Sequence, residues 1–355
     1  MSPPRILHLD SSSTWGGGQN QIRLLMRELA KVDVEQLCVC PLGSALAERL
    51  RAERLPVFPI AWRGGTDVRV LWRVARALPR YDIVHCHDAH ALQIALLPAR
   101  LLGKKLVAAR RVPFKTSALK WNRADVVVAV SEYVRQNLLR DGVLAERIRV
   151  IHSGTDAEET NAVHPLVPPV RQRYHLPAEA FVVASAASLV PVKGQSIIPE
   201  AAALLPDVHW FIAGAGPLKA ELETAIAEHG VTDRVHLLGW LPDARRLFKE
   251  ADAYLSASID DGLGNSITES LAMHVPVISA DGGGGAEIMR PVHERTDAVL
   301  YEAGNAESLA RVITRLRDAA TRAEVIAAQD ARFPDFDIRR TSSQTLELYR
   351  QLVGN

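Results

Sequence analysis

The chain has 355 residues, of which 48% are hydrophobic and 23% charged, a composition typical of a soluble globular protein with room for two domains. No stretch approaches about eighteen apolar residues, and the N-terminal segment lacks the apolar core of a signal peptide, so we expect neither a membrane-spanning helix nor secretion. The three cysteines, Cys38, Cys40 and Cys86, lack metal-ligand spacing. We expect a reduced, cytoplasmic protein, with peripheral attachment to the inner face of the cytoplasmic membrane as an option.

The formal net charge of +1 conceals a strong asymmetry between the two parts of the chain. Residues 1–155 carry 24 Lys and Arg against 13 Asp and Glu, whereas the remaining residues carry 18 against 28. The basic excess concentrates between Arg63 and Arg123. This pattern favours an anionic acceptor or an anionic membrane surface, and a solvated basic face is the alternative. Nucleic acid is not expected as a partner, because aromatic residues are few there and no nucleic-acid module is recognisable.

Apolar runs that are typical of strands alternate with helical stretches along the first part of the chain. Near-continuous apolar strands separated by helices predict a parallel sheet covered on both faces. The predicted strands are 6–9, 35–40, 57–60, 83–87, 106–109, 126–130 and 148–151. The predicted helices include 19–31, 45–53, 68–78, 89–102 and 132–141.

Three prolines at 165–169 interrupt this alternation, since proline continues neither a helix nor a central strand. We expect an interdomain linker over 157–175, an N-terminal domain over 1–165 and a second domain over 166–336. A helix over about 337–355 is a candidate to pack back on the first domain. The predicted strands of the second domain are 181–187, 210–213, 235–238, 253–256, 277–279 and 298–301. The fold class is therefore α/β, with two tandem doubly wound, Rossmann-like domains.

The segment 258–280 carries the strongest chemical signal of the chain. Its predicted strand ends in the turn Gly262-Leu263-Gly264, and a helix is expected to begin near Asn265. Glycines let backbone N–H groups approach a ligand, and a helix N-terminus favours negative charge. The carboxylates of Asp261 and Glu269 are suited to sugar hydroxyls. We predict a cradle for a phosphate and a polyol, and an ordinary strand-to-helix turn is the alternative.

Three other segments lie at or after predicted strands. They are Ser12-Ser-Thr-Trp-Gly-Gly-Gly-Gln-Asn20, Asp82-Ile-Val-His-Cys-His-Asp88 and Ser185-Ala-Ala-Ser-Leu-Val-Pro-Val-Lys-Gly-Gln195. The first lacks the Gly-x-Gly-x-x-Gly spacing of dinucleotide-binding loops. The period of a strand places His85 and His87 on one face, with His85 deeper in the core. The chain resembles glycosyltransferase family 4, of the GT-B fold, over nearly its whole length. The order and spacing of five segments carry this resemblance: the three above, the segment 258–280 and the later run 281–288.

The resemblance implies a retaining glycosyltransferase of hexosyltransferase type that uses a nucleotide diphosphate sugar. It assigns acceptor binding to the first domain and donor binding to the second. The implied catalytic residues are His87, Lys193 and Asp261. The implied donor-binding residues are Gly17, Gly18, Ser188, Lys193, Gly262, Leu263, Gly264, Glu269 and Glu287.

The chain departs from the family pattern at two of these positions. Ser188 stands where the family has an arginine, and a hydroxyl donates a hydrogen bond but does not neutralise a pyrophosphate. Asp261 stands where the family has a glutamate, which is longer by one methylene. These departures motivate one alternative, a catalytically degenerate nucleotide-sugar-binding protein. A GT-B sugar-nucleotide epimerase or hydrolase is a second alternative.

The acceptor is expected to contact the basic first domain through Arg110, Arg111 and Lys115. An anionic glycan or glycolipid of bacterial cell-surface polysaccharide or lipopolysaccharide synthesis suits that charge. Neither a metal nor another cofactor is expected, because Lys193, Ser188 and backbone amides would stabilise the charge of the departing pyrophosphate.

Overall fold

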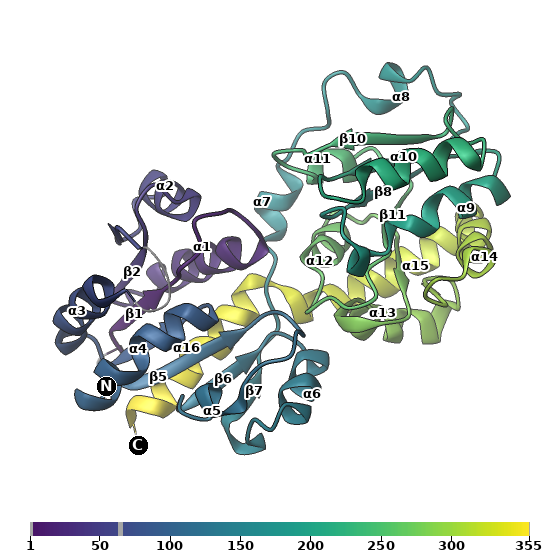
Figure 1. Cartoon of the computed structure of the whole chain (residues 1–355). Coiled ribbons are helices and arrows are strands. Elements are labelled where there is room, and N and C mark those ends of the chain that lie inside the picture. The colour runs from purple at the N-terminus through teal and green to yellow at the C-terminus, as the bar shows by residue number, and fades with distance from the viewer. Residues whose placement is uncertain (1–2, 63–66, 355) are drawn as a thin grey trace. The chain divides into compact units, whose positions relative to one another are not determined.

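The computed structural model describes residues 3–62 and 67–354. Arg63, where the predicted basic stretch begins, lies outside the described residues. The chain divides into two compact units (Figure 1). Unit 1 comprises Met1–Gly154 together with Asp337–Asn355, and unit 2 comprises Thr155–Phe336. None of the described helices is both long enough and apolar enough to cross a membrane.

Unit 1 is built on a seven-stranded parallel sheet of order β3-β2-β1-β4-β5-β6-β7. The order reverses direction between β1 and β4, as in doubly wound folds, in which ligands bind at the carboxyl ends of the strands. The strands are β1 (Ile6–Leu9), β2 (Gln36–Pro41), β3 (Val57–Ile60), β4 (Ile83–Cys86), β5 (Lys105–Arg110), β6 (Val126–Ala129) and β7 (Ile148–Val150).

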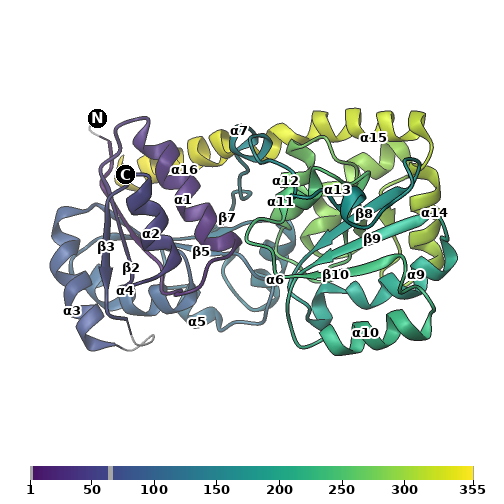
Figure 2. The same ribbon diagram turned by 90° about the horizontal axis from the view of Figure 1, so that it is seen from above.

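Helices cover both faces of this sheet, as the apolar strands predicted. They are α1 (Gly17–Ala30), α2 (Ala45–Ala52), α3 (Val68–Ala77), α4 (Ala89–Leu101), α5 (Ala118–Trp121), α6 (Glu132–Arg140), the C-terminal α16 (Ile338–Gly354), and the 3-10 turns η1 (Leu78–Arg80) and η2 (Ala145–Arg147). Helix α16 lies alongside α1 (Figure 2). Tyr349 of α16 packs in one buried cluster with Leu25 of α1 and with Ile6, Ile83 and Val107 of the sheet. These apolar contacts fix α1 and α16 on one face of the sheet.

Unit 2 repeats the architecture with a six-stranded parallel sheet of order β10-β9-β8-β11-β12-β13. The strands are β8 (Phe181–Ala186), β9 (Val208–Ala213), β10 (Val235–Gly239), β11 (Ala253–Ser256), β12 (Val277–Ala280) and β13 (Leu300–Tyr301). The helices are α7 (Ala157–Asn161), α8 (Val170–Arg173), α9 (Ile198–Leu204), α10 (Lys219–Glu228), α11 (Arg245–Phe248), α12 (Asn265–Ala272), α13 (Gly283–Thr296), α14 (Ala306–Leu316) and α15 (Ala319–Arg332), with the 3-10 turns η3 (Pro191–Lys193), η4 (Gln195–Ile197) and η5 (Phe333–Phe336). Each strand predicted from the sequence is present, with ends that shift by at most two residues.

The boundary between the units lies after Gly154, earlier than the position 165 expected from the prolines. The backbone of Gly154 exchanges two hydrogen bonds with the Gln21 amide of α1, at 2.7 and 2.8 Å, which ends unit 1 there. The next residue, Thr155, already bonds to Thr268 of unit 2 at 2.7 Å. The Asn161 amide donates to the carbonyl of Ala272 at 2.8 Å. The expected linker over 157–175 therefore contains α7 and α8 and belongs to unit 2.

Candidate active site

The loops at the carboxyl ends of the unit 2 strands are locked together by close backbone contacts. Gly194, with φ of 66°, places its Cα against the carbonyl of Ala257, and an added Cβ would lie 2.1 Å from that oxygen. The amide of Ile259 donates to the carbonyl of Val192 at 3.1 Å. Only glycine accommodates both this conformation and this approach. The loop that carries Lys193 is therefore held against the loop that carries Asp261.

A second close contact holds the other side of the Lys193 loop. An added Cβ on Gly216 would lie 2.3 Å from the carbonyl oxygen of Leu189. The amide of Leu189 donates to Ala215 at 3.0 Å, and the amide of Leu218 donates back to Leu189 at 3.1 Å. The loop after β8 is thus fixed between the loops that follow β9 and β11.

The predicted residues Lys193 and Asp261 meet in this arrangement. The Lys193 ammonium donates to Asp261 Oδ2 at 2.7 Å, while Asp261 Oδ1 accepts from the amide of Gly262 at 2.9 Å. Both side chains are partly exposed, at 24% and 33%. An ion pair so accessible to water is weak, which leaves both groups able to exchange partners for a ligand.

The turn after Asp261 presents backbone rather than side chains. Gly264 has φ of 94° and is the N-cap residue of α12, where it offers no side chain to cap the first turn of that helix. Leu263 is 3% exposed, so its side chain lies in the core and only its backbone is available to a ligand. The run of glycines that opens α13 packs on this turn, where an added Cβ on Gly284 would lie 2.3 Å from the carbonyl oxygen of Gly262. Helix amides without a side-chain cap are suited to an anion.

Glu269 lies within α12 and is half-buried. Burial raises the pKa of its carboxyl to about 7, the Arg245 guanidinium opposes this shift, and the nearby carboxylates Asp243 and Glu159 add to it. Glu269 therefore changes charge near neutral pH.

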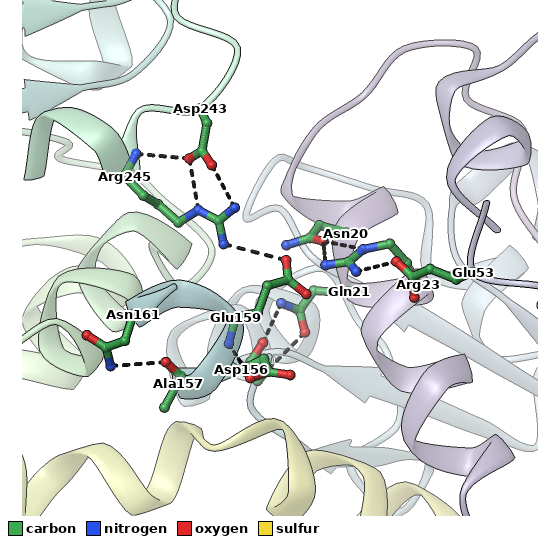
Figure 3. Close-up of polar contacts among 11 residues, drawn as sticks. Asn20, Gln21, Arg23, Glu53, Asp156, Ala157, Glu159, Asn161, Asp243 and Arg245 are labelled. Atoms are coloured by element: carbon green, nitrogen blue, oxygen red, sulfur yellow. Dashed lines mark hydrogen bonds and ion pairs between the residues drawn. The ribbon is translucent and has the colours of Figure 1, made fainter. Parts of the chain in front are cut away.

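Arg245 lies among three carboxylates, Asp243, Glu159 and Glu269, of which Figure 3 shows the first two. Its guanidinium binds Asp243 in a fork, with two N···O distances of 2.8 Å, and lies 3.6 Å from Glu159. Sequence reasoning missed Arg245 and Glu159. The spacing Asp243-x-Arg245 after a strand was the one available signal, and the pairing with the distant Glu159 has no signal in the sequence.

Two predicted donor residues of unit 2, Ser188 and Glu287, lie outside the ion pair of Lys193 and Asp261. Ser188 is exposed near the start of the loop after β8. Glu287 is half-buried in the second turn of α13. Ser188 thus remains accessible from solvent at the same sheet edge as Lys193.

In unit 1 the glycine loop after β1 leads into α1, which begins at Gly17. The loop is anchored by Asp10, a buried carboxylate that accepts from the Gln19 amide at 3.1 Å and from the amide of Ser12 at 3.3 Å. Burial and the charge of Asp88 raise the pKa of Asp10 to about 7. Gly18 lies in contact distance of Arg111, since an added Cβ would be 3.5 Å from Arg111 Cδ. Sequence reasoning missed Asp10.

Three histidines lie on one face of the unit 1 sheet, at the end of an apolar row. His8 of β1 pairs in register with His85 of β4, and His87 follows two residues later. Their exposures are 0%, 2% and 5%. His85 Nδ1 bonds to the hydroxyl of Tyr349 at 2.6 Å, so it is the hydrogen-bonded core histidine that the sequence predicted.

His87 is directed inward, in contrast to the expected contact with a ligand. Its Nε2 lies 3.0 Å from His8 Nδ1, and its Nδ1 lies 3.2 Å from a guanidinium nitrogen of Arg111. Both ring nitrogens therefore have partners within the protein. His87 was expected at the C-terminal end of its strand, within reach of a ligand, and the structure places it directly after β4 with a side chain that is 5% exposed.

The three basic residues expected to bind the acceptor differ in the direction and exposure of their side chains. The Arg110 guanidinium donates to the carbonyl of Phe114 and lies 5.3 Å from the Trp121 ring centroid, so it packs inward. Arg111 is directed toward His87, and burial lowers its pKa to about 10. Lys115 is exposed. The structure therefore does not gather the three into one outward-facing phosphate site.

Comparison with known proteins gives two matching families. The family described as "Glycosyltransferase Family 4" matches residues 15–159, and the family "Glycosyl transferases group 1" matches residues 168–330. Among curated relatives, the lipopolysaccharide core biosynthesis glycosyltransferase LpsD of Rhizobium meliloti (strain 1021) is 31% identical over 322 residues, 88% of each chain. LpsE of the same organism is 32% identical over 169 residues, 48% of this chain and 47% of that one.

Solved structures share the fold over almost the entire chain. A glycosyltransferase from Rickettsia africae superposes with a TM-score of 0.88 at 19% identity, covering 100% of both chains. Anabaena Alr3699/HepE, determined in complex with UDP and glucose, superposes with a TM-score of 0.83 at 23% identity, covering 98% of this chain and 100% of that one. The two sheets, the strand-end loops and the identity to LpsD together place this chain in glycosyltransferase family 4, as an enzyme of the GT-B fold that transfers a sugar.

Proposed function

We propose that this enzyme transfers a sugar from a nucleoside diphosphate sugar to an anionic glycan or glycolipid, with retention at the anomeric carbon. The observation that carries the proposal is the set of interlocked loops in unit 2. These loops bring Lys193, Asp261 and the start of α12 to one sheet edge, with Glu269 inside the same helix. Lys193 supplies a cation and the helix supplies amides for a diphosphate, and carboxylates supply acceptors for sugar hydroxyls.

The difficult step of such a transfer is the departure of a charged leaving group. In our proposal, Lys193, the amides at the start of α12 and the hydroxyl of Ser188 stabilise the negative charge that develops on the diphosphate. The bond from the anomeric carbon to the phosphate oxygen breaks while the acceptor oxygen bonds to the same face of that carbon. The acceptor proton passes to the departing phosphate oxygen. None of these steps requires a metal ion or a covalent nucleophile.

The carboxylates have different roles in this proposal. Glu269 accepts hydrogen bonds from the ribose diol, Asp261 accepts from the transferred sugar, and Glu287 lies near the donor at the start of α13. When a diphosphate draws Lys193 away, Asp261 is released to bind a hydroxyl. The weak pair seen in the structure is therefore a resting arrangement that the donor replaces.

Two findings support the choice of substrates. HepE, which shares the fold, was determined with UDP-glucose as well as with UDP, which makes UDP sugars the first donors to test. LpsD and LpsE act in lipopolysaccharide core biosynthesis, which supports a glycolipid of the bacterial envelope as acceptor, bound by the basic unit 1.

A basic and apolar face on α3 and α4 supports an acceptor that resides in a membrane. Val68 and Trp72 of α3 and Leu97 and Leu101 of α4 are exposed, and α3 packs along α4. Exposed arginines alternate with them at positions 69, 73, 76 and 100. Apolar side chains that enter the interface, together with arginines that meet lipid phosphates, are the features of peripheral attachment to an anionic membrane.

The proposal is tested by thermal shift of the full chain against a panel of nucleotides and nucleotide sugars, beside Glu269→Ala. We expect stabilisation by one nucleoside diphosphate and its sugar, lost in the variant, and formation of an α-linked product from an α-linked donor. Binding without transfer to any envelope glycan would identify a degenerate binding protein. Turnover of the donor without acceptor would identify an epimerase or hydrolase, and no response to any nucleotide would refute the proposal.

A further inference from the structure

The hydrogen bonds around His87 fix the tautomer of two buried histidines. A guanidinium donates and never accepts, so His87 Nδ1, at 3.2 Å from Arg111, must be unprotonated. The neutral ring then carries its proton on Nε2 and donates it to His8 Nδ1 at 3.0 Å. His8 in turn must carry its proton on Nε2. One choice of tautomer therefore accounts for the contacts from Arg111 through His87 to His8 Nδ1.

The row ends at Gln36 on the neighbouring strand. Gln36 donates its amide N–H to the carbonyl of Met26 at 2.7 Å, which directs its oxygen away from that carbonyl. That oxygen and His8 Nε2 are both buried and lack a partner at normal hydrogen-bond distance among the described residues. The carboxamide of Gln36 is nevertheless close enough to His8 to oppose the lowering of its pKa by burial.

The imidazoles in this row remain neutral. Burial lowers the pKa of His8 to about 3 and holds the pKa of His87 and His85 well below the ordinary value. Arg111 keeps its charge, and its guanidinium is held by the backbone carbonyl of His87 at 3.3 Å as well as by the ring. The partners on His87 are neutral and orient the guanidinium without neutralising it. The carboxylates Asp10 and Asp88 also act on its charge from nearby, so an anionic ligand would compete with these two groups.

We propose that His87 and His8 are positioning residues that orient Arg111 toward an anionic group, a phosphate or carboxylate, of the acceptor. The inference rests on the proposed role of unit 1 in acceptor binding. In this arrangement His87 acts through Arg111 and does not touch the substrate. The order of the row is Gln36 of β2, His8 of β1, His87 after β4 and Arg111 after β5, so each member comes from a different strand or strand end of one sheet.

The same three histidines offer nitrogens within 4.8 Å of one another, as a metal site would. A metal ion needs an unprotonated ring nitrogen from each ligand. In the proposed row His87 has none to offer, because Nδ1 accepts from Arg111 and Nε2 carries the proton. The three histidines therefore cannot bind a divalent ion while His87 holds Arg111 in this way. A spectrum that reports the tautomer of His87 distinguishes the two arrangements.

The first test records long-range ¹H–¹⁵N correlation spectra of the full chain with ¹⁵N-labelled histidine, from about pH 5.5 to 8, a range around the ordinary histidine pKa. His8→Asn and His87→Asn assign the two signals. We expect both rings to be neutral Nε2–H tautomers throughout, with or without added Zn²⁺. An Nδ1–H tautomer at His87, protonation within this range, or a shift caused by bound Zn²⁺ would overturn the proposal. This result does not depend on any transfer activity.

The second test follows the Arg111 Nε–H signal during titration with inorganic phosphate. His8→Leu removes the acceptor for His87 and should weaken the phosphate-induced shift at least fivefold. His8→Asn retains an oxygen near the position of Nδ1 and should stay within twofold of wild type. Tyr349→Phe, which removes the hydroxyl bonded to His85 and leaves the hydrogen bonds of the row in place, is the matched control and should have no effect.

An Arg111 signal that ignores phosphate, or that responds equally in His8→Leu and wild type, would refute the positioning role. If His8→Leu does not fold, the tautomers of the wild-type histidines and the response of the Arg111 signal to phosphate still test the proposal. A positive outcome in a protein that transfers no sugar would leave the row in place and refute the proposed function alone.

Discussion

The ammonium of Lys193 lies 2.7 Å from the carboxylate of Asp261, so the two residues expected to bind different parts of one donor bind each other. The family pattern has a glutamate at the position of Asp261. The shorter aspartate reaches Lys193 because Gly194 brings its loop against Ala257. The aspartate at 261, which departs from the family pattern, thus depends on the close contact between Gly194 and Ala257 for its ion pair.

Replacing Asp261 with Asn should separate nucleotide binding from transfer. Lys193 then loses its competitor, so UDP should bind up to about fivefold more tightly, since an exposed pair contributes up to about 1 kcal/mol. Transfer should fall, because the amide no longer accepts from the sugar as a carboxylate does. Isothermal titration with UDP and a transfer assay measure the two effects. Lys193→Ala is the comparison and should lose both, and weaker UDP binding by Asp261→Asn would contradict this account.

Glu269→Gln should stabilise the protein at alkaline pH. The folded pKa of Glu269 is about 7, above its ordinary value of 4.5, so the group contributes stability at low pH that is lost as pH rises to about 7. The glutamine variant escapes that loss and should be more stable at pH 8 by roughly 1–3 kcal/mol, with little difference near pH 4.5. Urea unfolding at both pH values measures this. Glu228→Gln, at an exposed position at the end of α10, should show no such trend.

Gly194→Ala should unfold or loosen the donor loops of unit 2. The φ of 66° alone costs an L residue about 1–2 kcal/mol, and the clash with the carbonyl of Ala257 should bring the total to the order of 3–5 kcal/mol. Gly230→Ala is a matched control, because Gly230 has φ of 65° in the same unit and open space around it. Thermal unfolding and UDP affinity, measured for both variants, test this difference. Equal losses in the two would show that the close backbone approach is unimportant.

The α3–α4 face should bind vesicles that contain anionic lipid. Arg73→Gln should reduce partitioning about fivefold, since a basic residue near an anionic surface contributes about 1 kcal/mol. Trp72→Ala should also reduce it, through loss of the interfacial aromatic ring. Arg140→Gln, exposed on α6, is the control and should bind as wild type does. Co-sedimentation with phosphatidylglycerol vesicles at low and high salt measures the effect, and binding that salt does not weaken would count against the face.

The sheets could be predicted from sequence because each strand is a short, nearly continuous apolar run bounded by glycine, proline or a helix start. Strand β8 shows this well, since Phe181–Ala186 contains no charged residue. The domain boundary could not be predicted in the same way. The prolines at 165–169 attract attention, but hydrogen bonds from Gln21 to Gly154 decide where unit 1 ends.

The chemistry of the site was only partly visible in the sequence. Asp261 and Glu269 stand out because their spacing follows a strand and a glycine turn. Arg245 did not, because its partner Glu159 is distant in sequence and an ion pair leaves no periodic pattern. The role of His87 toward a ligand stays a prediction. A strand pattern gives the face on which a side chain lies and does not reveal that Arg111 and His8 lie within hydrogen-bond distance of its two ring nitrogens.

The return of α16 to unit 1 has a consequence for how the protein is made. Unit 2 is one uninterrupted segment, whereas unit 1 requires Tyr349 from the far end of the chain to complete the core beneath His85. During synthesis the sheet of unit 1, although made first, therefore lacks one of its covering helices until the segment that follows unit 2 has been made. Until that last helix emerges, an apolar face of the earlier-made domain is open to chaperones or to aggregation.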